Sequence, residues 1–201
     1  MTVRIRGAAD IGDATTVLLL ASDAYDRSAD ACVTVLDRLG DRIDRAVPVT
    51  ISLPAAEWLA LWEREADTGP PLAACVDVDR PTRSAAGAGD AHDTVPVERV
   101  VDPTDMEALG RRISDVLQRA DDAGERVGVA VHSLTGVLGH VDESTAFKFV
   151  YTLGEVARRV DGIVVFHLDP EAHDDETVET FRIVCDAVVD TDSGRSAAAG
   201  P

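Results

Sequence analysis

The stretch Thr16-Val17-Leu18-Leu19-Leu20-Ala21 decides the fold class, because apolar residues follow one another there without polar alternation. A strand that is buried on both faces of a parallel sheet has this pattern, whereas a half-exposed strand alternates. Residues 28–39 then repeat apolar side chains at i, i+3, i+4 and i+7, with Ser28 placed to cap a helix and Gly40 placed to end it. This strand-then-helix unit predicts a parallel sheet covered by helices.

The same alternation continues along the chain. Further strands are predicted at 47–53, 72–78, 97–101, 127–131, 162–168 and 186–190, and further helices at 54–69, from 102 onward, at 142–160 and at 174–184. We therefore expect one three-layer α/β domain with a mainly parallel central sheet over residues 14–192. An N-terminal extension (1–13) precedes it, a disordered tail (193–201) follows it, and residues 79–96 are expected to form a mobile loop.

The charge composition indicates the setting of the protein. The chain carries 19 basic and 37 acidic residues, a net charge of −18, and 26 of the acids are Asp. Lys148 is the only lysine, and asparagine is absent. This composition suits a haloarchaeal cytoplasm at molar salt, where the Debye length falls to about 3 Å, although an acidic protein of a high-GC bacterium is the alternative. General nucleic-acid binding is not expected, since the arginines are scattered among acids.

Other sequence features also predict a cytoplasmic protein. No apolar run approaches the ~20 residues that a membrane span needs, and no apolar stretch follows the charged start of the chain, so neither a membrane segment nor a secretory signal is expected. Cys32, Cys75 and Cys185 are widely spaced in apolar surroundings, which predicts buried free thiols in a reducing compartment.

The turn after the first long strand is where such folds hold phosphate groups. It reads Ala21-Ser22-Asp23-Ala24-Tyr25-Asp26-Arg27-Ser28. A phosphate loop of the form GxxxxGK[ST] needs glycines whose amides wrap the phosphates, a lysine and a hydroxyl for Mg²⁺. This turn has no glycine and no lysine, and GxGxxG is also absent. We interpret it as a degenerate phosphate-loop position made of Ser22, Asp23, Asp26, Arg27 and Ser28.

Four stretches in the second half carry a family resemblance. They are Val129-Ala130-Val131-His132-Ser133-Leu134-Thr135-Gly136-Val137-Leu138, Asp142-Glu143-Ser144-Thr145-Ala146-Phe147-Lys148-Phe149, Phe166-His167-Leu168-Asp169-Pro170-Glu171-Ala172-His173-Asp174 and Val101-Asp102-Pro103-Thr104-Asp105-Met106-Glu107-Ala108-Leu109-Gly110. The first resembles the Walker B strand of the KaiC-like branch of the RecA superfamily. Together they are similar to a haloarchaeal group of small RecA-like proteins of unassigned function. The resemblance spans about 97–190, and residues 14–80 match mainly by layout.

The resemblance implies a RecA-like core, and the departures from it imply lost catalysis. The family's Mg²⁺-binding Asp corresponds to His132, which precedes Ser133, and imidazole serves this hard cation poorly. We therefore expect no ATP hydrolysis and no cofactor. The expected function is a regulatory or signal-transduction interaction module with a protein partner, and with self-association as an option that the family suggests. A nucleotide-responsive switch or weak ATPase that still binds ligand at this site is the alternative.

Other chemistries have weaker support in the sequence. No metal site is expected, because no HxH or HExxH spacing fixes a geometry, but His132, His167, Asp169 and His173 are the candidate ligands for Zn²⁺ or another transition metal. A receiver-type phosphotransfer site near Asp23, Asp77 and Asp79 lacks the lysine that it would need. Ser133 follows a strand without the GxSxG elbow of a nucleophile.

Overall fold

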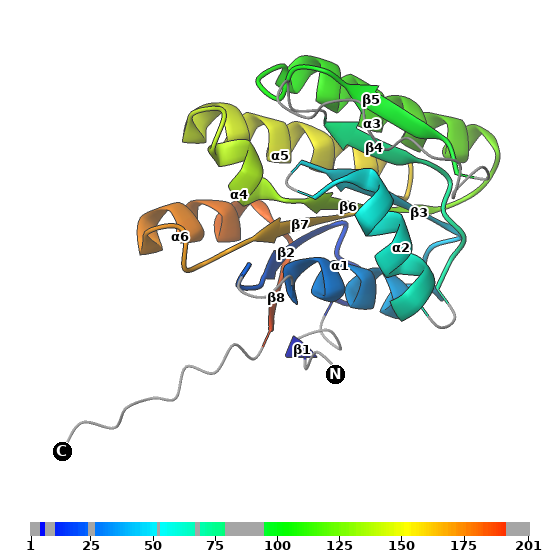
Figure 1. Cartoon of the computed structure of the whole chain (residues 1–201), viewed down its shortest axis with the longest axis horizontal. Coiled ribbons are helices and arrows are strands. Elements are labelled where there is room, and N and C mark those ends of the chain that lie inside the picture. The colour runs from blue at the N-terminus through cyan, green and yellow to red at the C-terminus, as the bar shows by residue number, and fades with distance from the viewer. Residues whose placement is uncertain are drawn as a thin grey trace.

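The computed structural model describes residues 5–6, 11–23, 27–51, 53–66, 69–78 and 95–191. They form one eight-stranded sheet in the order β1-β8-β2-β7-β6-β3-β4-β5 (Figure 1). The strands are β1 (Ile5–Arg6), β2 (Thr16–Leu20), β3 (Arg45–Thr50), β4 (Cys75–Val78), β5 (Val97–Val100), β6 (Val127–His132), β7 (Ile163–Leu168) and β8 (Ala187–Thr191). All pairs among β2 to β8 are parallel, and β1 joins β8 in the antiparallel sense.

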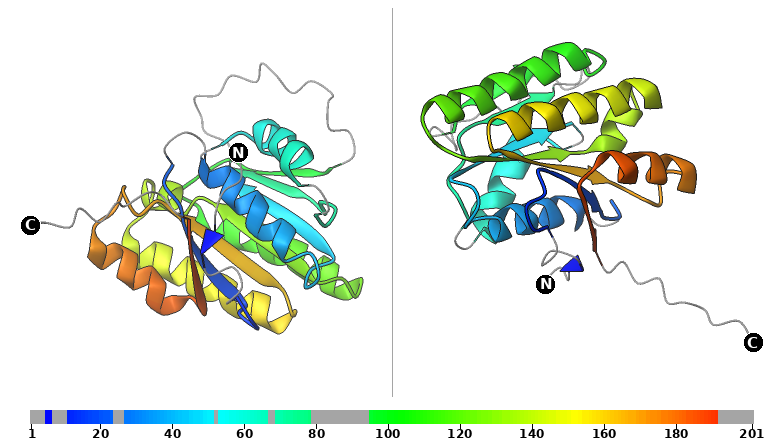
Figure 2. Two further views of the ribbon diagram at one scale, coloured as in Figure 1. Left: turned by 90° about the horizontal axis from the view of Figure 1, so that it is seen from below. Right: turned by 180° about the vertical axis from the view of Figure 1, so that it is seen from behind.

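Helices cover both faces of the sheet. They are α1 (Arg27–Arg38), α2 (Ala55–Glu65), α3 (Met106–Asp122), α4 (Leu134–Leu138), α5 (Glu143–Arg159) and α6 (Asp175–Val184). α1 and α2 lie on one face, while α3, α5 and α6 lie on the other (Figure 2). In β2, Val17 and Leu19 pack in the core beneath α1 and α2, whereas Leu18 and Leu20 pack in the core on the other face. All four side chains are buried. The predicted three-layer α/β fold with a mainly parallel sheet is confirmed.

Several boundaries differ from the predicted ones for local reasons. Pro54 is the residue before α2 rather than its first, and β3 ends at Thr50 instead of reaching 53. Asp105 caps α3 by accepting from Ala108 N at 2.8 Å. Asp102, where this helix was expected to begin, instead accepts from the backbone and hydroxyl of Thr104 and so closes a turn of its own. Most of the expected mobile loop (79–94) and the expected disordered tail (193–201) lie outside the described residues.

The three cysteines are free, as predicted. Cys32 and Cys75 are buried and Cys185 is half-buried. Burial raises the pKa of the Cys75 thiol to about 12, and neighbouring Asp77 acts in the same direction. The thiols are therefore protonated and unreactive at neutral pH. In the described part of the chain, no helix combines the length and the apolar character that crossing a membrane requires.

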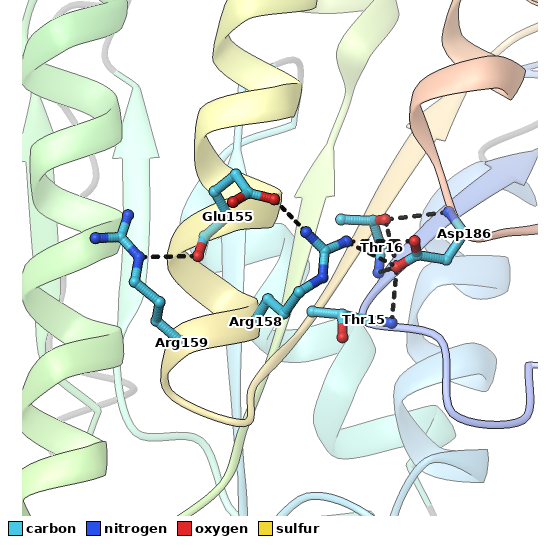
Figure 3. A network of polar contacts seen from close by, with 6 residues as sticks. All are labelled: Thr15, Thr16, Glu155, Arg158, Arg159 and Asp186. Carbon is cyan, nitrogen blue, oxygen red and sulfur yellow. Dashed lines mark hydrogen bonds and ion pairs between the residues drawn. The ribbon is translucent and has the colours of Figure 1, made fainter.

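A carboxylate fastens the start of β2 to the start of β8, at the opposite end of the strands from their carboxyl termini (Figure 3). Asp186 Oδ2 accepts hydrogen bonds from Thr15 N (3.1 Å), Thr16 N (2.9 Å) and Thr16 Oγ1 (2.8 Å). Arg158 of α5 lies 3.3 Å from Asp186 Oδ1 and also pairs with Glu155. Burial raises the pKa of Asp186, but these hydrogen bonds and Arg158 outweigh it, so the net pKa is lowered.

Replacing Asp186 with alanine is expected to lower the free energy of unfolding at pH 7 by about 1–2 kcal/mol, because two backbone amides lose their acceptor. The figure is modest since the carboxylate is 37% exposed and solvent screens it. A lowered folded-state pKa contributes stability above the unfolded pKa of about 3.9, and this is lost as the pH falls through the folded value. Urea unfolding of the parent and of Asp186→Ala at pH 7 and at about pH 3 tests this expectation. The difference in unfolding free energy between the two proteins should shrink at the lower pH, and a difference that grows would contradict the prediction.

Candidate strand-end site

Two buried histidines lie side by side at the carboxyl ends of adjacent strands. His132 ends β6 and His167 is the penultimate residue of β7. Their rings stack, with centroids 5.1 Å apart and planes 15° from parallel. Only 5% of His132 and 0% of His167 is exposed. Ligands of open α/β sheets bind at this edge, which makes it the candidate site.

Each ring has one nitrogen bonded to the segment that follows β2. His132 Nε2 lies 2.9 Å from Ser28 Oγ, and this contact is buried. His167 Nε2 lies 2.8 Å from the carbonyl oxygen of Ala21, so that nitrogen carries the proton and donates it. The Nδ1 atoms of both rings are buried and have no hydrogen-bond partner among the described residues. Ser28, which the sequence suggested as a helix cap, is the second residue of α1 and reaches across to β6.

Burial keeps both histidines neutral. It lowers the pKa of His132 to about 4, with repulsion from His167 adding to the effect and Asp23 opposing it. Burial also lowers the pKa of His167, against the hydrogen bond to Ala21 and the charges of Asp23 and Asp169. Asp23 Oδ1 approaches His167 Nε2 to 3.8 Å. Because the ring is neutral at pH 7, this contact is not an ion pair.

Asp169 connects the exits of β2 and β7. Its Oδ2 accepts from Asp23 N at 3.1 Å and its Oδ1 accepts from Glu171 N at 2.9 Å. Its own backbone N–H donates to Thr135 Oγ1 at 2.9 Å. Glu171 in turn accepts from the hydroxyl of Ser22 at 3.0 Å. Asp169 is only 8% exposed, so these bonds hold the turn after β2 against the turn after β7.

The remaining predicted site residues have other roles or lie outside the described residues. Ser133, joined to His132 by a cis peptide bond, caps α4 by accepting from Gly136 N at 3.0 Å. His173 is half-buried and contacts Thr135 Oγ1 at 3.2 Å. The structure does not describe Asp26, and it describes only the backbone of Arg27, where α1 begins.

The structure adds Asp23 to the two histidines. Asp23, His132 and His167 each offer one metal-ligating atom, and these three atoms lie within 4.8 Å of one another. The sequence marked both histidines as candidate ligands but placed Asp23 only in the degenerate phosphate turn. Spacing along the chain could not join them, because β2 lies beside β7 in the sheet but is far from β6 and β7 in the sequence.

A cavity of about 390 Å³ lies elsewhere, between α3 and α5. Met106, Gly110, Phe149 and Leu153 line it together with Lys148. It shares no residue with the strand-end site. We place the candidate site at the strand ends because buried, unpartnered polar atoms gather there.

A family model matches most of the chain. Residues 14–191 match a model described as "Family of unknown function (DUF7504)". The chain belongs to this family. No curated protein matches it.

Solved structures show that this chain has a RecA-like fold. An uncharacterized protein of Pyrococcus horikoshii, PH0321, crystallised with an unknown peptide, is 15% identical, with a TM-score of 0.57 over 88% of this chain and 76% of its own. An ATPase of the type III secretion system of pathogenic bacteria is 12% identical, with a TM-score of 0.52 over 94% of this chain and 57% of its own. At these identities the similarity shows the fold alone: a RecA-like α/β domain.

Proposed function

We propose that this DUF7504 chain is a non-catalytic RecA-like domain that serves as a regulatory or signal-transduction module and binds a protein partner. The observation that carries the proposal is the buried 2.9 Å contact between Ser28 Oγ and His132 Nε2. In P-loop NTPases, Mg²⁺ is held by the serine or threonine of the phosphate loop and by the Walker B aspartate. Here the two corresponding positions bond directly to each other, and neither carries a charge at pH 7.

The rest of the phosphate turn also does not fit a magnesium triphosphate. Ala21 to Ser28 has the eight-residue length of GxxxxGK[ST], with Ala21 and Asp26 in the glycine positions and Arg27 in the lysine position. The amide of Asp23, within this turn, already donates to the carboxylate of Asp169. An amide that is committed to an internal carboxylate cannot also wrap a phosphate, and the added negative charge disfavours one.

The same bonds support a binding role. They hold the exits of β2, β6 and β7 together. A rigid surface of this kind suits the recognition of a partner better than it suits catalytic turnover. We infer that the partner contacts this face, at residues 22–27 and 132–139, or the segment 79–96. A membrane and general nucleic acid are not proposed as partners, because the net charge of −18 repels anionic surfaces.

Nucleotides are expected to leave the melting temperature unchanged. The test adds millimolar ATP, ADP or GTP with Mg²⁺ to the protein in molar KCl, where surface charges are screened. A ligand at 100 times its Kd stabilises by about 2.7 kcal/mol, roughly 5–10 °C for a domain of this size. An active RecA-like ATPase in the same buffer is the positive control. A shift of that size, or phosphate release that Ser28→Ala abolishes, would overturn the proposal in favour of a nucleotide-responsive switch.

A further inference from the structure

The strand-end site has the ligands of a transition-metal centre. We propose that Asp23, His132 and His167 bind one divalent transition-metal ion of the Zn²⁺ class, with solvent completing its coordination. The three residues come from the turn after β2 and from β6 and β7. Two imidazoles and one carboxylate are a recurrent set of ligands for such ions, whereas Mg²⁺ prefers oxygen alone.

The spacing of the donors is close to that of a bound ion. One ligating atom from each of the three residues lies within 4.8 Å of the other two. Tetrahedral coordination with bonds of about 2.0–2.1 Å places ligand atoms ~3.3 Å apart. The necessary contraction falls mainly on Asp23, whose side chain is 39% exposed and can rotate. This exposure also leaves an entry path and a side open to water.

The buried ring nitrogens are a second, independent observation. His132 and His167 are at least nine-tenths buried, yet Nδ1 of each has no partner among the described residues. In His167 the proton lies on Nε2, which donates to Ala21 O, so Nδ1 is a bare lone pair. A buried acceptor without a partner lowers the free energy of unfolding by about 1–3 kcal/mol, and a bound ion would supply the missing partner. Metal-binding histidines commonly have their other ring nitrogen bonded to a carbonyl in this way.

Binding should tie three strand exits together and requires no nucleotide. Asp169, whose carboxylate accepts from the amide of Asp23, holds the third ligand's backbone beside the rings. None of the three ligands belongs to the hydrophobic cores, so a bound ion would displace no core side chain. The inference therefore stands independently of the proposed function, because it rests on these donors and not on lost catalysis.

The test measures metal binding by protein purified without a histidine tag, in molar KCl that screens the exposed carboxylates. After incubation with ZnCl₂ and gel filtration, about one equivalent of zinc should remain per chain. Co²⁺ should give the visible absorption of a tetrahedral site, and an excess of Mg²⁺ should not displace it. Asp23→Asn should weaken zinc binding at least about tenfold while the protein stays folded, as circular dichroism checks. Asp175→Asn, an exposed aspartate on α6, is the matched control and should bind as the parent does.

His167→Gln removes one of the proposed imidazole ligands and should also weaken zinc binding. His140→Gln is its control and should bind zinc as the parent does. Less than about 0.1 equivalent of zinc on the parent protein would overturn the inference. So would equal weakening by Asp23→Asn and Asp175→Asn, which would show ions held only by surface carboxylates. Because no nucleotide is present, failure here leaves the proposed function untouched. A nucleotide-induced shift in melting temperature would likewise leave the metal result intact.

Discussion

Replacing His132 with aspartate should lower the free energy of unfolding by about 3 kcal/mol and should not create a nucleotide site, even though aspartate is the Walker B residue of P-loop NTPases. The position is 5% exposed and stacks on the ring of His167. A carboxylate there would be buried without a cation, near the acid Asp23, so it would either stay charged at a high cost or take up a proton. Urea unfolding at pH 7 measures the loss, and the thermal-shift test with Mg²⁺ and ATP checks for binding.

His132→Gln is the matched control for this substitution. Its neutral amide can still meet Ser28 Oγ, so we expect a loss of only about 1 kcal/mol. A His132→Asp protein as stable as the parent, with a melting temperature that rises with Mg²⁺ and ATP, would show that the site tolerates a buried carboxylate and can bind magnesium and nucleotide. In that case the β6 exit would not exclude a nucleotide, and the proposed function would lose its main support.

Much of the fold could be predicted because burial on both faces leaves a strong trace in the sequence. β2 and α1 follow from an apolar run and from a helical stripe that begins near Ser28. α4 went unpredicted, since a helix of five residues is too short to show a period. β1 was missed for the same reason: two residues carry no pattern. The start of α3 was misplaced because Asp102 and Asp105 are both plausible caps, and only the hydrogen bonds distinguish them.

The candidate site was predicted in pieces. Strand ends pointed to His132 and His167, and the turn after β2 pointed to Asp23 and Ser28. What the sequence could not supply is the order of the strands, which places β7 between β2 and β6. That order brings Ser28 to His132 and Ala21 to His167, 146 residues further along the chain. Parallel sheets pair strands that are remote in sequence, so local patterns cannot reveal these contacts.

Replacing Phe166 with alanine is expected to lower the free energy of unfolding by about 4 kcal/mol, the largest loss that we predict for a single substitution. The side chain is 0% exposed in β7, in the core beneath α5. Its ring meets Phe149 of α5 edge to face, with centroids 6.4 Å apart and planes at 78°. Alanine removes this contact and leaves a cavity that the flanking strands β2 and β6 cannot close by moving. Urea unfolding monitored by circular dichroism gives the value.

Phe166→Leu is the control, because it keeps most of the volume and should cost under about 1.5 kcal/mol. A loss below about 1 kcal/mol for alanine would mean that the core beneath α5 collapses onto the gap. The pair of variants also separates the fold from the site. Phe166 points into the core on one face of β7, whereas its neighbour His167 bonds to Ala21, next to α1 on the other face. Zinc binding should therefore survive in Phe166→Leu, and its loss there would show that the strand-end geometry depends on packing across the sheet.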